Sequence, residues 1–428
     1  MKATVAAPSK TPAPRFRRLV AIGFCLAFLP AGLAFSQDLG DQEIAPGAPL
    51  PVNSVTDGSQ REVDMALAPD DDMVIVWRQD VTTVAARRLS ADGALTPPAD
   101  FQISADTTET KSRPVVCVDG AGNSVIAWQQ RQSGGLQLNE VRVRKFDRDF
   151  NPLTNDVQAS PVTTSSAFRP SVACAANGDY VVAWGDLSVR ARRYAADGTD
   201  LGVLQVQTQG GLPDNIAGVQ IAAQDNGDFV VVWSTTSDAL NARRFSGDGV
   251  ALDASPFEVA SGEPVRAIGV DKHGESGDFI IAWNDDSNFG RDVKVQRYDS
   301  SAVPTGNTTF AQVAFTSPIQ TSAAFSGPNG EVVVAWNPAN GEPAMVQRLD
   351  AAMQPLGSIF ELGPEGGSSN LRFGLEGKAT DGELATAYQN FVPSQSQDVF
   401  ARRFLEAIFA DGFESGDTSE WTATIVDP

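Results

Sequence analysis

The sequence predicts an all-β protein, a seven-bladed β-propeller with four-stranded antiparallel blades. Two observations carry this prediction. A short apolar strand that ends in an aromatic residue recurs seven times along the 428 residues, and the last copy of the repeat lacks a strand that is found, unattached, ahead of the first copy. Self-similarity at a fixed period is the signature of a repeat architecture, and it takes precedence over any local secondary-structure pattern.

The recurring strand is the marker of each unit. Its aromatic residue is tryptophan in six units and tyrosine in the seventh, at Trp77, Trp128, Trp184, Trp233, Trp283, Trp336 and Tyr388. The intervals between these residues are 51, 56, 49, 50, 53 and 52 residues. Such intervals are too long for short helical repeats and match a propeller blade of four strands. The aromatic residues could present a series of faces to sugar rings, but their constant place after an apolar strand favours packing between blades.

Each unit contains the four strands that a blade requires. A short apolar segment (strand A) and a tight turn such as 225–228 precede the marker strand, which is strand B. A strand with period-two alternation, for example 189–194, follows as strand C, and an Asp-Gly turn leads to a shorter strand D such as 257–259. Consecutive antiparallel strands place the A–B and C–D turns on one face of the ring and the B–C and D–A loops on the other.

The two ends of the array predict how the ring closes. The seventh unit reaches its C strand at 399–404 and has no D strand behind it. Residues 48–53, ahead of the first A strand, have the composition of a D strand without a blade of its own. We therefore expect this N-terminal strand to complete the last blade, which covers an exposed sheet edge and ties the termini to the stability of the ring.

Three segments are distinguished by composition. Basic residues precede an apolar run from Leu19 to Leu33, and a small-x-small sequence ends at Ser36, so residues 1–36 are interpreted as a signal peptide. Residues 43–406 form the predicted propeller, and residues 407–428 are a short C-terminal tail. We expect a secreted or periplasmic protein, associated with the cell surface in one version of this hypothesis, with no membrane insertion after signal cleavage.

The net charge of the chain argues against some classes of binding partner. The net charge is −21, and removal of the five basic residues within 1–36 makes it −26. Such an acidic protein repels phosphate backbones and anionic lipid, so nucleic acid is not an expected partner. A protein or glycan ligand is expected instead, and the protein is expected to be a monomer.

The cysteines beyond the signal peptide are Cys117 and Cys174, in corresponding strands of neighbouring units. They lie eleven and ten residues before the tryptophans of their units. Because successive side chains of a strand point to opposite faces, the two cysteines should point to opposite faces of their sheets. We expect two buried free thiols.

A second in-register series consists of basic residues in strand C. It comprises Arg88, Lys145, Arg193, Arg244, Arg297, Arg348 and Arg403. A ring of cations could line an anion-binding channel, yet acidic residues recur in register too, at Asp179, Asp228, Asp278, Glu331 and Glu383. Pairing within or between blades is the preferred interpretation.

Residues for several kinds of chemistry are missing. The single histidine, His273, lies in a predicted turn, so histidine-based triads and zinc sites lack their parts. No segment has the alternating acidic pattern of a calcium loop, and 70–72 and 225–228 are explained as turns. No catalytic, cofactor-binding or metal-binding residue is assigned.

The connections of one face vary in length and composition, whereas those of the other are short and stereotyped. The variable connections include 129–140, 284–292 and 390–398. Variable loops on a constant scaffold are how binding faces are built. The candidate ligand-binding residues on this face are Arg131, Asp285, Asp286, Phe289, Arg291 and Phe391.

Two resemblances follow from these motifs. The G-D-F-V-V-V-W strand with its R-R-F strand and D-G turn resembles uncharacterised secreted bacterial tandem-repeat β-propeller proteins, over residues 43–406, which implies fold and export but transfers no site residue. The tail resembles a D-G-F-E-S-G-D-T-S-x-W motif near the ends of many exported Gram-negative proteins, which implies a sorting or surface role, and it is also similar to the first strand of a jelly-roll domain.

The predicted function is a non-catalytic exported binding or scaffold propeller that recognises protein or glycan through its variable loop face. The alternative is a carboxylate-dependent carbohydrate-active hydrolase or lyase, since propellers host many chemistries. A cluster of carboxylates with perturbed pKa values in a deep central pocket would favour the alternative.

Overall fold

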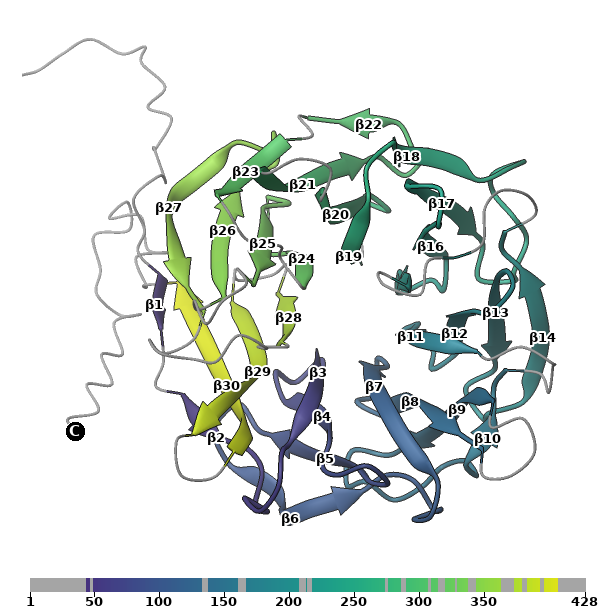
Figure 1. Cartoon of the computed structure of the whole chain (residues 1–428), viewed down its shortest axis with the longest axis vertical. Helices are drawn as coiled ribbons and strands as arrows, with labels where there is room; N and C mark the ends of the chain where they lie inside the picture. Colours follow the sequence, from purple (N-terminus) through teal and green to yellow (C-terminus); the bar gives the residue numbers. More distant parts are fainter. Residues whose placement is uncertain are drawn as a thin grey trace, which may run out of the picture. The chain divides into compact units, whose positions relative to one another are not determined.

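A computed structural model of the chain shows seven blades around a central axis (Figure 1). Residues from Gly40 onward form one compact unit. The structure describes residues 44–46, 49–132, 138–160, 167–207, 213, 218–273, 276–285, 290–306, 309–314, 320–327, 329–337, 344–362, 373–378, 383–392 and 396–406. The predicted signal peptide and C-terminal tail lie outside these residues. The described residues hold no helix long and apolar enough to cross a membrane.

The strands follow the predicted A-to-D order in each blade. The A strands, nearest the axis, are β3 (Arg61–Leu67), β7 (Thr110–Val118), β11 (Phe168–Cys174), β15 (Val219–Ala223), β19 (Val265–Lys272), β24 (Thr321–Phe325) and β28 (Phe373–Gly377). The B strands are β4 (Met73–Arg78), β8 (Ser124–Arg131), β12 (Tyr180–Gly185), β16 (Phe229–Ser234), β20 (Phe279–Asp285), β25 (Val332–Trp336) and β29 (Leu384–Val392).

The outer half of each blade is formed by strands C and D. The C strands are β5 (Val84–Leu89), β9 (Asn139–Phe146), β13 (Val189–Tyr194), β17 (Ala239–Phe245), β21 (Gly290–Tyr298), β26 (Met345–Leu349) and β30 (Ser396–Glu406). The D strands are β6 (Leu95–Gln102), β10 (Val157–Gln158), β14 (Asp200–Gln205), β18 (Phe257–Ser261), the pair β22 (Pro304–Thr305) and β23 (Thr309–Ala314), and β27 (Pro355–Glu361). Within the part of the chain that the structure describes, no strand of its own repeat follows β30 in the seventh blade.

The N-terminal segment supplies the missing strand, as predicted. Strands β1 (Ile44–Pro46) and β2 (Leu50–Pro51) pair antiparallel with β30, the C strand of the last blade. The Val52 N–H donates to the Val399 carbonyl at 2.8 Å, and Asn53 exchanges side-chain hydrogen bonds with Asp398 and the Val399 N–H. The ring is therefore closed by a strand from the beginning of the chain.

The hydrophobic core is divided among the seven interfaces between blades. Each marker aromatic belongs to a cluster that contains residues of the preceding blade; Trp128, for example, packs with Val76 and Ala86 of the first blade. All seven aromatics are at most 3% exposed. Their burial confirms packing between blades, and each contributes on the order of 4–6 kcal/mol from its buried area.

The basic residues of strand C are also structural. Arg297 pairs with Asp278 of its own blade at 2.7 Å and donates to the Gly330 carbonyl of the next blade at 2.9 Å. The same two-sided pattern holds Lys145 between Asp119 (2.9 Å) and the Gly178 carbonyl (2.8 Å). These contacts confirm the pairing within and between blades, and they leave the cations away from a central anion channel.

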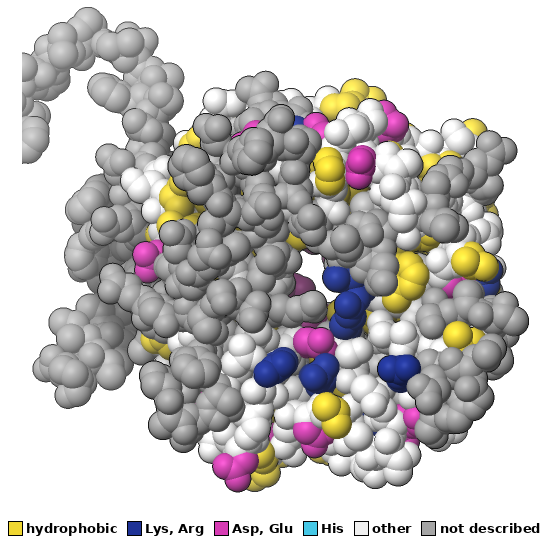
Figure 2. Space-filling model, in the orientation of Figure 1, with side chains coloured by type: hydrophobic (Ala, Val, Ile, Leu, Met, Phe, Trp, Pro, Cys, Tyr) yellow, Lys and Arg dark blue, Asp and Glu magenta, His cyan; other side chains and the backbone are white. Residues whose placement is uncertain are grey.

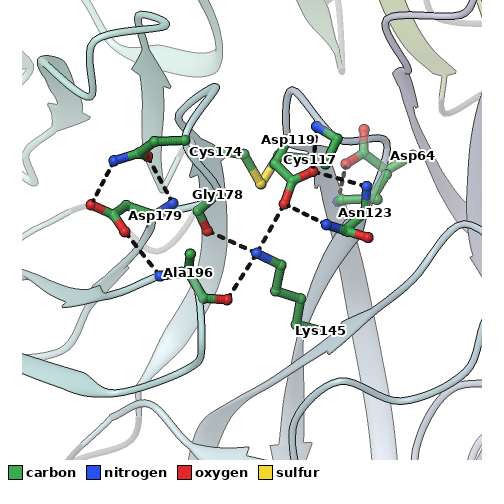
Figure 3. The surroundings of a disulfide bond; sticks show 12 residues. Asp64, Cys117, Asp119, Asn123, Lys145, Cys174, Gly178, Asp179 and Ala196 are labelled. Atoms are coloured by element: carbon green, nitrogen blue, oxygen red, sulfur yellow. Dashed lines mark hydrogen bonds and ion pairs between the residues drawn. A yellow bond between two sulfur atoms is a disulfide. The ribbon is translucent and has the colours of Figure 1, made fainter.

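The prediction of two free thiols is wrong. Cys117 and Cys174 form a disulfide with their Cα atoms 5.6 Å apart, next to the Lys145 contacts (Figure 3). Their pairing partners, Val125 and Tyr180, show that the two cysteines are one residue out of register, so they do point to opposite faces. Neighbouring blades, however, face each other with opposite faces of equivalent sheets. The two sulfur atoms can therefore meet only if the two cysteine side chains point to opposite faces of their own sheets.

Candidate functional site

The A strands enclose a cavity of about 250 Å³ at the centre of the ring. Its lining includes polar and charged side chains from five blades at the loop-face end of these strands. We call this group the channel mouth; it comprises Glu62, Arg113, Arg169, Gln220 and Gln320. Figure 2 shows Lys and Arg side chains at the edge of the central opening, with acidic side chains among them.

A repeated backbone distortion places the charged residues of the mouth. Strands β3, β7 and β11 each carry a register shift against their B strands, of the kind produced by a β-bulge. At these bulges Glu62, Arg113 and Arg169 have φ angles of +57°, +54° and +47°. A left-handed non-glycine residue costs on the order of 1 kcal/mol or more, and bulges that re-aim side chains are concentrated next to functional sites.

Hydrogen bonds link the first two of these residues. A carboxylate oxygen of Glu62 accepts a hydrogen bond from the Arg113 main-chain N–H at 2.6 Å, and the other lies 3.6 Å from the Arg78 guanidinium. The Glu62 N–H donates in turn to the Gln389 side chain of the last blade at 2.8 Å. Glu62 is thus tied to blades on both sides, which fixes its position at the mouth.

Arg169 lies against the fourth blade. The equivalent position there is Gly218, with φ of +81°, and a Cβ added to Gly218 would stand 2.5 Å from the Arg169 Cδ. The Arg169 N–H donates to the Gln129 side chain at 3.3 Å. Glycine at position 218 therefore leaves room for the aliphatic part of the Arg169 side chain.

On the other side of the ring, the mouth is bordered by carboxamides. Gln320 accepts a hydrogen bond from the Phe373 N–H at 3.0 Å and donates to the Phe373 carbonyl. The mouth consequently presents two guanidinium groups and a carboxylate on one side and neutral amides on the other.

Carboxylates lie deeper in the channel, along the same strands. Asp64 accepts a hydrogen bond from the Val116 N–H (3.0 Å) and Asp271 accepts one from the Phe325 N–H (2.8 Å), each in the next blade. Burial raises the pKa of Asp271 to about 6. Burial, together with the charge of Asp271, raises the pKa of Glu376 to about 8. Among the described residues, no group of three acidic, histidine or cysteine side chains is arranged to hold a metal ion.

Two of the residues predicted from the sequence, Arg131 and Asp285, lie outside the channel mouth. Arg131 is exposed at the end of β8, where it pairs with Thr110 and Asn139. The Asp285 carboxylate is held 3.0 Å from the Lys294 ammonium, which also contacts Glu263.

The other four predicted residues are described in part or not at all. Arg291 and Phe391 belong to strands β21 and β29, but their side chains are outside the described part of the chain, as are Asp286 and Phe289 entirely. Neither Arg131 nor Asp285 lines the central cavity. The prediction that these six residues form one binding face therefore stays a prediction.

The residues of the channel mouth were missed because the search concentrated on the B–C loops. A sequence signal does exist: an Arg-Pro dipeptide lies at the bulge of strand A in two successive units, at Arg113-Pro114 and Arg169-Pro170. In both units the arginine stands two positions before a residue that faces the next blade. A charged residue at this place in the repeat marks the part of strand A that lies near the axis. The bulge could not be foreseen, since it depends on the pairing register.

Comparison with known proteins supports the fold. No protein-family model matches the chain, and no curated protein matches its sequence. Among solved structures, the BP39L lectin from Burkholderia pseudomallei is similar with a TM-score of 0.58 at 12% identity, covering 80% of this chain and 95% of the lectin. A protein of unknown function from Dyadobacter fermentans has a TM-score of 0.55 at 10% identity, covering 85% and 99%.

An enzyme is among the similar structures too. An ulvan lyase, a polysaccharide lyase solved with a bound -[GlcA(1-4)Rha3S]- unit, has a TM-score of 0.51 at 10% identity, covering 85% of this chain and 94% of the lyase. At such identities the likeness establishes the β-propeller fold and nothing finer. Propellers of unknown function, a lectin and a glycan-degrading enzyme all share it.

Proposed function

We propose that this chain is an exported, non-catalytic binding propeller that recognises a glycan or protein ligand through its loop face. The observation that carries the proposal is the channel mouth. Three neighbouring blades hold charged side chains in strained left-handed conformations at the edge of one cavity. Backbone strain at equivalent positions of several rigid strands is characteristic of a binding site that needs its side chains in fixed positions.

Export is part of the proposal. Residues 1–36 have the composition of a signal peptide, and the disulfide between Cys117 and Cys174 fits an oxidising compartment such as the periplasm or the cell exterior. The tail at 407–428 is proposed to act in sorting or surface attachment. The propeller is proposed to act as a monomer, since its ring closes on itself and leaves no blade incomplete.

The proposal is tested by a glycan-array and pull-down screen with the purified protein. One variant replaces residues 133–137, in the B–C loop of the second blade, by Gly-Gly. The control variant is Val250→Ser, in a C–D turn on the opposite face, where Val250 is 63% exposed. We expect saturable binding that the loop variant weakens and the control does not. Equal loss in both variants, or unchanged binding in the loop variant, would contradict recognition by the loop face.

A second candidate function, a carboxylate-dependent glycan hydrolase or lyase, is favoured by one observation. Glu376 and Asp271 have raised pKa values in the central channel, as expected for a general acid. Both carboxylates nevertheless accept main-chain hydrogen bonds from the next blade, which gives them a structural role. Turnover of an acidic or neutral polysaccharide that is abolished in Glu376→Gln, with the fold retained, would replace the binding proposal by the enzymatic one.

A further inference from the structure

The sign of charge changes along the channel axis. The chain as a whole is acidic, with a net charge of −21. At the mouth, however, two neighbouring blades carry Arg113 and Arg169 at equivalent positions, both half-buried beside the same cavity. The carboxylates of Asp64 and Glu376 lie further along the A strands, toward the face of the ring that carries the A–B and C–D turns. A basic mouth on an acidic protein is a local field that attracts anions to that point.

The two arginines occupy backbone positions that favour glycine. Both have a left-handed φ, and the matching residue of the fourth blade is glycine, which adopts this conformation without strain. Glycine at 113 and 169 would therefore be the residue of lowest backbone energy. Arginine at these two positions is therefore explained by its side chain and not by its backbone conformation.

The chemistry of the lining distinguishes between classes of ligand. Protein ligands are usually anchored by aromatic and aliphatic side chains that enter apolar pockets. The channel mouth offers guanidinium, carboxylate and carboxamide groups, and the hydroxyl group of Ser322 lies along the same lining. Such a surface matches a ligand that is rich in hydroxyl groups and carries negative charge.

We infer that the channel mouth binds an anionic glycan, with Arg113 and Arg169, which line the same cavity, as the residues that bind its carboxylate or sulfate groups. This inference rests on the proposed loop-face function and specifies its ligand class. Arginine binds both kinds of anion through paired N–H donors. Glu62, which faces the same cavity, repels the anion and limits its affinity. Removal of the Glu62 charge should therefore strengthen binding, a change opposite in sign to removal of either arginine.

The experiment measures binding of four defined polymers by titration calorimetry at low and at physiological ionic strength. The probes are oligogalacturonate (carboxylate), dextran sulfate (sulfate), neutral dextran and poly-glutamate. The variants are Arg113→Gly, Arg169→Gly and Glu62→Gln, with Arg148→Gln as the control because its side chain is 55% exposed in a turn of the opposite face. Melting temperatures are recorded for all variants.

We expect at least one anionic glycan to bind and neutral dextran not to. Either arginine-to-glycine variant should weaken binding by about tenfold or more without lowering the melting temperature, because glycine relieves the left-handed strain. Glu62→Gln should strengthen binding about threefold, and the control should leave it unchanged. The ratio of the affinities for oligogalacturonate and dextran sulfate shows whether the site prefers a carboxylate or a sulfate group.

Several results would overturn the inference. These are unchanged affinity in both arginine variants, tighter binding of poly-glutamate than of the glycans, and no saturable binding of any anionic glycan at low ionic strength. A melting temperature that falls in parallel with affinity would assign the arginines to the stability of the fold. Binding that survives in the arginine variants but is lost in the 133–137 loop variant would refute the anion site and leave the loop-face function standing.

Discussion

At the scale of single residues, Glu376 has the most unusual environment in the described structure. It lies on strand β28 near the axis, accepts a hydrogen bond from the Leu67 N–H of the first blade and faces the charges of Asp271 and Asp64. The A strands converge at the axis, so most positions that face the next blade there hold small residues. A carboxyl group at such a position is kept protonated by desolvation and by like charge.

We predict that Glu376→Gln raises stability at neutral pH. A carboxyl group whose pKa is raised to about 8 binds its proton more tightly in the folded than in the unfolded state. Its contribution to the free energy of unfolding is complete below about pH 4.5 and is lost as the pH rises toward 8. Thermal melts of the wild type between pH 5 and 8 should show a falling melting temperature, and glutamine should flatten that slope.

The slope is compared above pH 6, because the pKa of Asp271 is raised to about 6 and this group titrates in the lower part of the range. Asp119 and Asp106 have lowered pKa values, so their contributions change only at more acidic pH. Burial lowers the pKa of Lys272 to about 8, which affects stability above that pH. A slope between pH 6 and 8 that is equally steep in Glu376→Gln would show that Glu376 does not carry the effect.

The cysteines show how far single residues could be predicted. The period-two rule correctly placed Cys117 and Cys174 on opposite faces of their strands. The conclusion of free thiols failed because it treated the two strands as parts of one sheet, whereas they belong to neighbouring sheets that pack face to face. The rule was sound, and the missing information was the spatial relation between blades.

At the scale of the strand, the two consecutive basic residues of strand C act in opposite directions. The first reaches back: Arg243 donates to the Val206 carbonyl of the preceding blade at 3.0 Å, and Arg87 donates to the Val52 carbonyl at 2.7 Å. The second reaches forward, as Arg297 does to the Gly330 carbonyl. In the first four blades and the seventh, one dipeptide thereby connects its blade to both neighbours. In the fifth and sixth blades Gln296 and Gln347 take the first position and bond within their own blades.

We predict that Arg297→Leu destabilises the protein by about 2–3 kcal/mol. The substitution removes the ion pair with Asp278 and leaves that carboxylate and the Gly330 carbonyl without a charged donor in a half-buried place. Urea denaturation provides the measurement. Arg148→Leu, which breaks an exposed ion pair with Asp70, should cost less than about 1 kcal/mol. Similar losses in the two variants would show that the interface bond is no stronger than a surface pair.

The strands themselves were largely predictable, while the functional part of the A strands was not. Period-two alternation and the marker aromatics fixed strands B and C, because both faces of these strands are buried between blades. The bulges in β3, β7 and β11 insert residues that break the alternation at the point where Arg113 and Arg169 turn toward the channel. A pattern based on regular pleating gives no sign of a residue that leaves the pleat.

At the scale of the whole molecule, the stability of the ring depends on its closure. The segment around β2 buries Val52 completely and joins Asn53 to Asp398 and Val399. It also meets Arg87 of the first blade. Because the strand lies between the last blade and the first, its loss would open the ring and expose the edge of β30.

We predict that deletion of residues 43–54 destabilises the entire propeller by about 5 kcal/mol, from the burial of Val52 and several hydrogen bonds of about 1 kcal/mol each. The protein should melt at a lower temperature and aggregate through the free edge, as followed by calorimetry and light scattering. Deletion of residues 37–42 is the control and should have little effect. A single, unshifted melting transition after the 43–54 deletion would contradict closure as the source of cooperativity.

Ring closure also sets the order of events in folding. Asn53 and Asp398 are 345 residues apart in the sequence. A ribosome that adds 5–20 residues per second needs roughly 20–70 s to produce that length of chain. Throughout this interval the strand that completes the last blade has no partner, although it is among the first segments of the propeller to be made. The earliest-made strand is thus the last to find its place, and the newborn chain must be kept from pairing it with a neighbour until the final blade arrives.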